Sequence, residues 1–183
     1  MKTRTSIAFA LVSSVLLLSF AQTKSELEKA AKEDPTISAL VAKYKAEKYN
    51  YPVNAKLAYL YAQSGLTANA ETHYKQCLRI NPNSLEAYYG LTLVYFKAQN
   101  YPEAIRTTRQ WLKLDPNSYY GRFCLADALS LSGKVDDSID VLKTMLAQYP
   151  SDTAILGAMK TRYEYLKKNR EVKEIQALLD QLK

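Results

Sequence analysis

The sequence predicts an all-α protein built as a solenoid of helical hairpins. Its 183 residues include only five glycines and six prolines, too few for the many tight turns of a β protein, whereas good helix formers are plentiful. Three of the prolines, Pro82, Pro116 and Pro150, are each 34 residues apart. A fixed period of this size indicates stacked repeats. A composition that is 48% hydrophobic supplies a core for them.

The first residues have the pattern of a secretory signal peptide. Lys2 and Arg4 provide a positive start, residues 7–20 are mainly apolar, and residues 19–21 form a small-x-small cleavage site. We therefore expect a signal peptide over residues 1–21, its removal, and a periplasmic or secreted location. The alternative is an uncleaved membrane anchor, but the apolar stretch is shorter than the roughly 20 residues that span a bilayer.

The charge of the chain does not indicate nucleic-acid binding. The formal net charge is +7, and removal of the signal peptide with Lys2 and Arg4 lowers it to +5. Basic and acidic residues alternate, as in residues 167–174, which is typical of a solvated helix face. We expect no nucleic-acid partner and, after signal cleavage, no stable membrane span.

Residues 22–50 are interpreted as a polar segment followed by an N-terminal capping helix. The capping helix is predicted over residues 36–48, because Pro35 suits a helix entrance and apolar residues follow at helical spacing. The apolar residues on that face are Ile37, Leu40, Val41 and Tyr44. Such a helix would cover the first repeat, since end units of a solenoid have only one neighbour.

The repeats occupy residues 51–183. Placing the prolines at repeat position 32 gives three full units and a shortened fourth, namely 51–84, 85–118, 119–152 and 153–183. Positions 4, 7, 8 and 11 then share a face of one helix, and positions 20, 24, 27 and 28 share a face of the next. Position 7, for example, is occupied by Leu57, Leu91, Leu125 and Met159.

Each unit also carries helix boundary signals. Residues after the prolines are predicted N-caps, and Asn83 with Glu86 forms a capping-box-like pair. Glycines mark the turn between the two helices of a unit, and Pro102 suits a first helical turn. The predicted N-caps are Asn83, Asn117 and Ser151, and the turn glycines are Gly65 and Gly133. Lys160 and Asp180 replace apolar residues in the fourth unit, as expected of a polar end cap.

On these features, residues 51–183 resemble the tetratricopeptide repeat family. The match lies in the 34-residue period, the Leu and Tyr columns, Ala at position 20 and Pro at position 32. It implies a right-handed superhelical solenoid and a binding scaffold. The family's small residue at position 27 is replaced by Cys77, Trp111 and Met145, which alters the spacing between helices.

The resemblance also implies a binding groove on the concave face, lined by positions 2, 5, 9, 12 and 13 of each first helix. Its aromatic members indicate that a peptide or helix of a partner docks there. The alternative is that part of this aromatic set packs inside the solenoid. The candidate partner-binding residues are Tyr59, Gln63, Tyr89, Leu93, Phe96, Lys97, Tyr120, Phe123, Asp127 and Thr161.

The sequence gives no positive indication of an enzyme. The single histidine, His73, is expected to be a surface or partly packed residue, and no Cys or His pair has metal-ligand spacing. We expect no metal site and no cofactor. A weaker alternative is an enzyme in which Asp127 or Glu164 acts on a glycan, but neither has a paired carboxylate in the pattern.

The sequence therefore predicts an exported scaffold or adaptor that binds a peptide or helix of an envelope protein in the groove. The alternative is a self-associating structural protein of the cell envelope, so a homo-oligomer is among the expected states.

Overall fold

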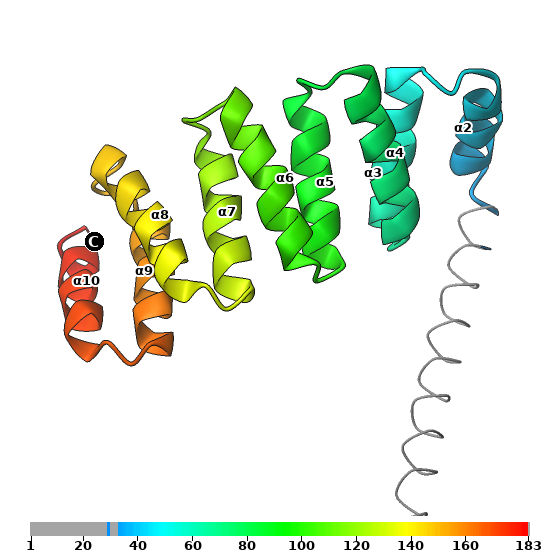
Figure 1. Cartoon of the computed structure of the whole chain (residues 1–183). Coiled ribbons are helices and arrows are strands. Elements are labelled where there is room, and N and C mark those ends of the chain that lie inside the picture. Colours follow the sequence, from blue (N-terminus) through cyan, green and yellow to red (C-terminus); the bar gives the residue numbers. More distant parts are fainter. Residues whose placement is uncertain (1–28, 30–32, 183) are drawn as a thin grey trace, which may run out of the picture. The chain divides into compact units, whose positions relative to one another are not determined.

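A computed structural model describes residue 29 and residues 33–182, so the predicted signal peptide lies outside the described residues. The described residues form α-helices and no strands, which confirms the predicted all-α solenoid (Figure 1). Among them, no helix combines the length and apolar character that crossing a membrane requires.

Helix starts repeat with the 34-residue period. First helices begin at Tyr51, Leu85, Tyr119 and Thr153, and each is followed by a second helix of the same hairpin. The helices are α2 Pro35–Ala46, α3 Tyr51–Gln63, α4 Thr67–Ile80, α5 Leu85–Lys97, α6 Tyr101–Leu114, α7 Tyr119–Leu131, α8 Val135–Gln148, α9 Thr153–Tyr165 and α10 Asn169–Gln181.

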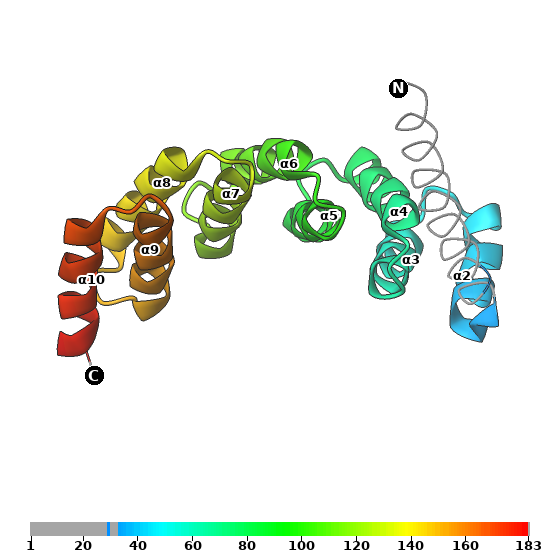
Figure 2. The ribbon, with the colours of Figure 1, turned by 90° about the horizontal axis from the view of Figure 1, so that it is seen from below.

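The chain divides into two compact units after Asn81. In unit 1, α3 packs against both α2 and α4. In unit 2, each helix from α5 to α10 packs against the next along the chain. Helices α5, α7 and α9 lie along one side of unit 2, and α6 and α8 lie along the other (Figure 2). The first helices of the last three repeats therefore present a common face.

The N-caps of the first helices lie one residue later than the sequence analysis predicted. The Ser84 hydroxyl accepts a hydrogen bond from the backbone N–H of Ala87 at 3.1 Å, and its counterparts cap α7 and α9 in the same way. The helices begin directly after repeat position 34, so position 33 still belongs to the turn. The caps are Ser84, Ser118 and Asp152, in place of Asn83, Asn117 and Ser151.

The turn between the two helices of each hairpin needs a left-handed residue. Gly65 and Gly133 have φ angles of 79° and 86°, as glycine allows at no steric cost. Gln99 and Lys167, at the same repeat position, have φ angles of 54° and 57°. Pro102 lies in the first turn of α6, as predicted. The turn geometry is therefore kept even where glycine is absent.

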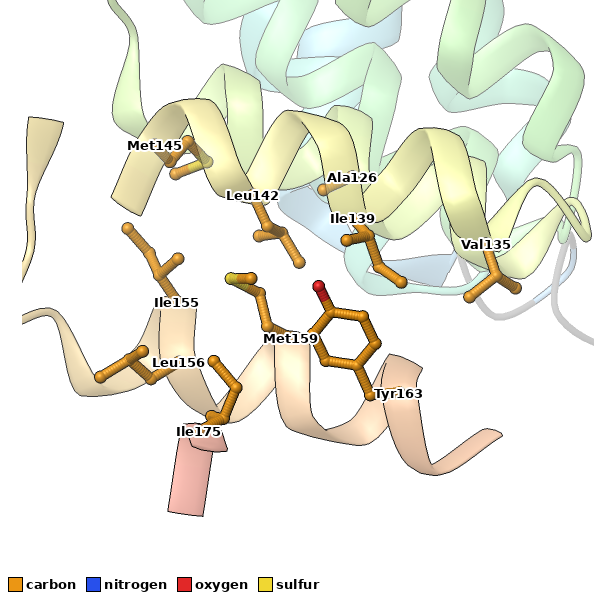
Figure 3. Packing of buried hydrophobic residues seen from close by; sticks show 10 residues of the cluster. All are labelled: Ala126, Val135, Ile139, Leu142, Met145, Ile155, Leu156, Met159, Tyr163 and Ile175. Atoms are coloured by element: carbon orange, nitrogen blue, oxygen red, sulfur yellow. The ribbon is translucent and has the colours of Figure 1, made fainter. Parts of the chain in front are cut away.

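A cluster of buried apolar residues lies at the C-terminal end of unit 2. Leu142 and Met145 of α8 meet Leu156 and Met159 of α9, and Ile175 joins them from α10 (Figure 3). All five side chains are buried. Residues of three consecutive helices thus share one cluster, which fixes how the hairpins of this unit stack.

Unit 1 contains a polar pair among its buried apolar residues. His73 of α4 is only 8% exposed and lies between the rings of Tyr44 and Tyr61, with centroid distances of 4.9 and 5.6 Å. Its Nδ1 is 2.9 Å from Oδ1 of buried Asn54. The Asn54 amide donates to two backbone carbonyls, so its oxygen accepts and His73 Nδ1 carries the proton. Burial lowers the pKa of His73 below 6.5. His73 is thus a packed structural residue.

Candidate functional site

Several predicted groove residues expose large apolar side chains on the first helices. In unit 2, Tyr89 and Leu93 of α5 are 43% and 45% exposed, and Tyr120 of α7 is 70% exposed. Their helices bury other positions, such as Leu91 and Ala126, against neighbouring helices. Helical periodicity leaves the residues between them facing solvent.

Two aromatic residues of the predicted set are half-buried instead. Phe123 packs against the apolar core of unit 2, with its ring centroid 5.8 Å from that of Tyr119. Phe96 lies 6.3 Å from Tyr101 of the following helix. Packing within the solenoid, the alternative left open by the sequence, therefore applies to these two residues and not to Tyr89 or Tyr120.

Asp127 has a structural partner that the sequence did not indicate. Arg162 of α9, although buried, donates from Nη2 to Asp127 Oδ1 and from Nε to the Ser138 hydroxyl at 2.9 Å. The Ser138 hydroxyl donates to the carbonyl of Ala126 at 2.6 Å. Asp127 therefore balances a buried guanidinium between consecutive repeats.

The remaining predicted residues are polar or lie in unit 1. Lys97 and Thr161 are exposed in unit 2. Tyr59 and Gln63 are exposed on α3 of unit 1, and Lys56 Nζ lies 5.5 Å from the centre of the Tyr59 ring. Tyr59 thus already has one cation against its ring.

An apolar pocket of about 340 Å³ lies among the exposed residues of α5 and α7. We call it the aromatic pocket, and its lining residues are Leu85, Glu86, Tyr89, Trp111 and Tyr120. Tyr89 meets Trp111 edge to face, with centroids 5.7 Å apart. The sequence analysis placed Tyr89 and Tyr120 in the groove but missed Trp111. The available signal was the bulky residue at a position where the family has a small one.

Trp111 carries an unusual polar group. Only 5% of the residue is exposed, yet its indole N–H has no acceptor among the described residues. A buried donor without a partner costs about 1–3 kcal/mol. Unsatisfied groups of this kind are rare in native interiors and call for a specific explanation. This one lies in the residue that lines the aromatic pocket from α6.

The described part of the chain contains one histidine and two cysteines. No group of three His, Cys, Asp or Glu side chains in it is placed to hold a metal ion. Cys77 is buried and Cys124 half-buried, and burial raises the pKa of the Cys124 thiol to about 11. A thiol with so high a pKa is a poor nucleophile at neutral pH.

Comparison with known proteins agrees with this class of fold. Residues 61–124 match the family model of the tetratricopeptide repeat. Over 99 residues the chain is 24% identical to Superkiller protein 3 of Schizosaccharomyces pombe. That match spans 54% of this chain but only 7% of the relative, so the chain corresponds to a small part of that protein.

Solved structures support the fold over most of the chain. A crystal structure of MamA has a TM-score of 0.70 and 21% identity, covering 87% of this chain and 90% of MamA. A tetratricopeptide repeat protein from Parabacteroides merdae has a TM-score of 0.65 and 21% identity, covering 90% of this chain and 60% of that protein. At this identity the similarity concerns the fold alone.

Proposed function

We propose that this protein is a protein–protein interaction scaffold that binds a peptide or helix of its partner on the first-helix face of the repeats. The observation that carries the proposal is the aromatic pocket, with exposed Tyr89, Leu93 and Tyr120 around it. Grouped large apolar residues on a soluble protein mark interaction sites more often than chance surface exposure.

The residue types fit a protein ligand. Tyrosine and tryptophan dominate binding hot spots, because they bury a large area with few rotatable bonds and retain a polar atom. The pocket is lined by buried Trp111 and by two exposed tyrosines, Tyr89 and Tyr120. One apolar side chain of a partner would fill much of it, and neighbouring leucine and tyrosine side chains would cover the flanking residues.

We base the proposed compartment and partner class on the N-terminal sequence. A signal peptide over residues 1–21 would deliver the protein to the periplasm or outside the cell, where its partner would be an envelope protein. No catalytic role is proposed, and no cofactor is needed for binding of this kind. Sequencing the N-terminus of the protein recovered from its own cells tests whether the signal peptide is removed.

The binding proposal is tested by crosslinked capture of the tagged protein, followed by mass spectrometry. The test variant is Leu93→Glu with Tyr120→Glu, which places two charges beside the aromatic pocket. The matched control is Leu114→Glu with Tyr49→Glu. It changes the same residue types at comparably exposed positions that do not line the aromatic pocket. We expect a partner that the native chain and the control retain and the test variant loses.

Binding to the identified partner is then followed by fluorescence of Trp111, the only tryptophan of the chain. A segment that enters the aromatic pocket should change its emission. Retention of every captured protein by the folded test variant, or partner binding with no change in emission and no loss in that variant, would contradict a role for this pocket.

Self-association is the second candidate function. It is favoured by α10, which buries Ile175 but leaves Leu178 exposed, and Leu182 directly after the helix is also exposed. These leucines would allow a second copy to pack against α10. Light scattering coupled to gel filtration tests this, and Leu178→Lys should shift a dimer to monomer. A concentration-independent monomeric mass would exclude this alternative.

A further inference from the structure

A second pocket, distinct from the aromatic one, lies on the solvent side of α6. It has a volume of about 340 Å³ and shares no lining residue with the aromatic pocket. We call it the basic pocket, and its main lining residues are Pro102, Ile105, Arg106, Arg109, Lys113 and Lys134. Its four cations come from one helix and from the residue that precedes α8.

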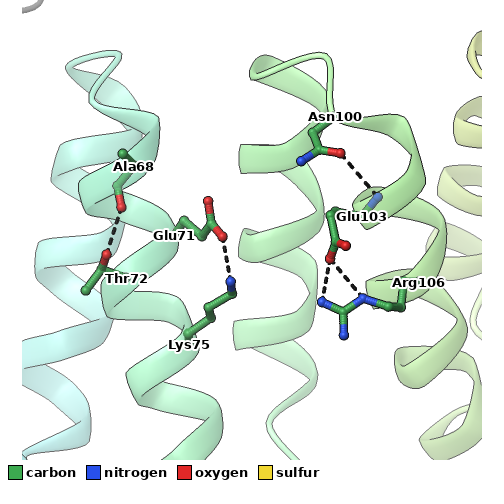
Figure 4. Close-up of polar contacts among 7 residues, drawn as sticks. All are labelled: Ala68, Glu71, Thr72, Lys75, Asn100, Glu103 and Arg106. Atoms are coloured by element: carbon green, nitrogen blue, oxygen red, sulfur yellow. Dashed lines mark hydrogen bonds and ion pairs between the residues drawn. The ribbon is translucent and has the colours of Figure 1, made fainter.

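Three of these cations lack a carboxylate partner. Arg106 is bound to Glu103, with Nε 2.8 Å from Oε2 (Figure 4). The side chains of Arg109, Lys113 and Lys134 form no hydrogen bond or ion pair with the described residues. All three are exposed. The pocket therefore has a local positive charge that the described residues do not neutralise.

The other repeats show what is missing at Arg109. Its equivalent in the first repeat, Lys75, is 2.6 Å from Glu71 of the same helix (Figure 4). Its equivalent in the third repeat, Lys143, is 3.6 Å from Asp140. In α6 the residues at the two acidic positions are Ile105 and Arg106. Arg109 therefore has no acid within reach along its own helix.

The same substitution pattern occurs at Lys134. Its equivalent in the next repeat, Lys168, is 2.9 Å from Asp136 of the preceding repeat. The position equivalent to Asp136 is Pro102, which lines the basic pocket. The basic pocket thus contains cations that also occur at the equivalent positions of other repeats. The second repeat, however, has apolar or basic residues where the first and third repeats have the carboxylates that pair with those cations.

This arrangement has a cost in stability. Arg109 and Lys113 are four residues apart on one helix face, where like charges destabilise a helix. A surface built only for solubility would alternate charges, as α10 does with Arg170 and Glu174 at 2.9 Å. Carboxylates from outside the chain would remove the cost.

We propose that the basic pocket binds a short acidic peptide segment of a protein partner. Pro102 and Lys113 are about 16 Å apart along the axis of α6, at about 1.5 Å per residue. An extended peptide of about five residues spans this length, at about 3.3 Å per residue. Its carboxylates pair with Arg109, Lys113 and Lys134, and its apolar side chains meet Pro102 and Ile105.

The test uses the full chain and a fluorescein-labelled pentapeptide in which glutamate alternates with leucine. Binding is measured by fluorescence anisotropy at low salt, with a peptide of alternating glutamine and leucine as the neutral control. The variant Arg109→Ala with Lys134→Ala is compared with Lys143→Ala with Lys168→Ala. Both remove two charges from the same repeat positions, but in the second pair each cation already has a carboxylate.

We expect the first pair to weaken binding of the acidic peptide at least tenfold and the second to change it less than twofold. Pro102→Asp supplies the carboxylate that Asp136 provides in the following repeat. It should weaken binding of the acidic peptide while leaving all cations in place. The Leu93→Glu, Tyr120→Glu variant should bind the acidic peptide as the native chain does, so the two proposed sites are tested separately.

Three results would overturn the proposal. Equal weakening by both double variants would show attraction by net charge alone. Displacement of the peptide by inorganic phosphate, at a concentration where chloride of equal ionic strength has no effect, would show a phosphate site. Binding of phosphatidylglycerol vesicles, lost in the Arg109→Ala, Lys134→Ala variant and not competed by the peptide, would show a lipid surface.

Discussion

Repeat positions 4 and 23 have opposite chemistry in the first repeat, which lies in unit 1, and in the last repeat, which lies in unit 2. In unit 1 they are Asn54 and His73, which are buried and joined by a 2.9 Å hydrogen bond. In the last repeat of unit 2 they are Leu156 and Ile175, which are buried in the apolar cluster. These two repeat positions therefore accept either a hydrogen-bonded polar pair or an apolar pair.

The two pairs should respond differently to mutation and to pH. An apolar pair is stabilised by area removed from water, which is insensitive to pH and tolerant of similar shapes. A buried hydrogen-bonded pair contributes little net stability, yet removing one partner leaves the other desolvated and unpaired. The Asn54–His73 pair of unit 1 should therefore be sensitive to single changes and to pH, whereas the Leu156–Ile175 pair of unit 2 should be sensitive to lost volume.

The largest effect is expected for Leu156→Ala in unit 2. Leu156 is fully buried, and truncating such a leucine loses about 3 kcal/mol through lost burial and the resulting cavity. Amide hydrogen exchange measured by mass spectrometry should show faster exchange in α8 to α10. The same substitution at Leu57, also fully buried, should act on α3 and α4. Equal loosening of both units by either variant would contradict separate responses.

His73→Ile should destabilise unit 1 by about 2 kcal/mol, even though isoleucine is the natural residue at the equivalent position of the last repeat. The reason is that the Asn54 oxygen would remain buried without its donor. Denaturant unfolding and hydrogen exchange in α3 and α4 measure the loss. A neutral or stabilising result would mean that the oxygen finds water or another donor.

Much of the architecture was predictable from sequence because period and turn geometry are local properties. The 34-residue spacing predicted the hairpins, and it also relates the left-handed residues Gly65, Gln99, Gly133 and Lys167. The family model independently covers residues 61–124. The capping helix predicted over residues 36–48 differs from α2, Pro35–Ala46, by one residue at its start and two at its end. The N-caps were displaced by one residue because both positions 33 and 34 hold residues that can cap.

The details of the candidate site were less predictable because they depend on pairs distant in sequence. Asp127 was placed among the binding residues, but its partner Arg162 is one repeat away and becomes visible only in the folded chain. Trp111 was noted as a departure from the family pattern, yet its place beside Tyr89 and Tyr120 depends on packing between helices. The hydrogen bond between Asn54 and His73 likewise joins two helices.

The double variant Asn54→Leu with His73→Ile sharpens the comparison, because it installs the pair of the last repeat in unit 1. It removes donor and acceptor together, so it should cost only about 1 kcal/mol, less than His73→Ile alone. The remaining loss comes from the two carbonyls that the Asn54 amide serves, those of Lys48 and Asn50. A double-mutant cycle measures the coupling. Additive losses would show that the two side chains do not act as a pair.

The smallest effect is expected from acidification. The pKa of His73 is lowered by burial, so below pH 6.5 the unfolded chain takes up a proton before the folded chain does. The stability of unit 1 should therefore be constant above pH 6.5 and fall as the pH decreases from 6.5 toward the folded pKa. The chain has one histidine, so no other imidazole contributes in this range. Hydrogen exchange corrected for intrinsic rates at pH 7.5 and 5.5 should show the loss in α3 and α4 of the native chain and not of the Asn54→Leu, His73→Ile variant. An equal loss in both would assign the acid sensitivity to carboxylates instead.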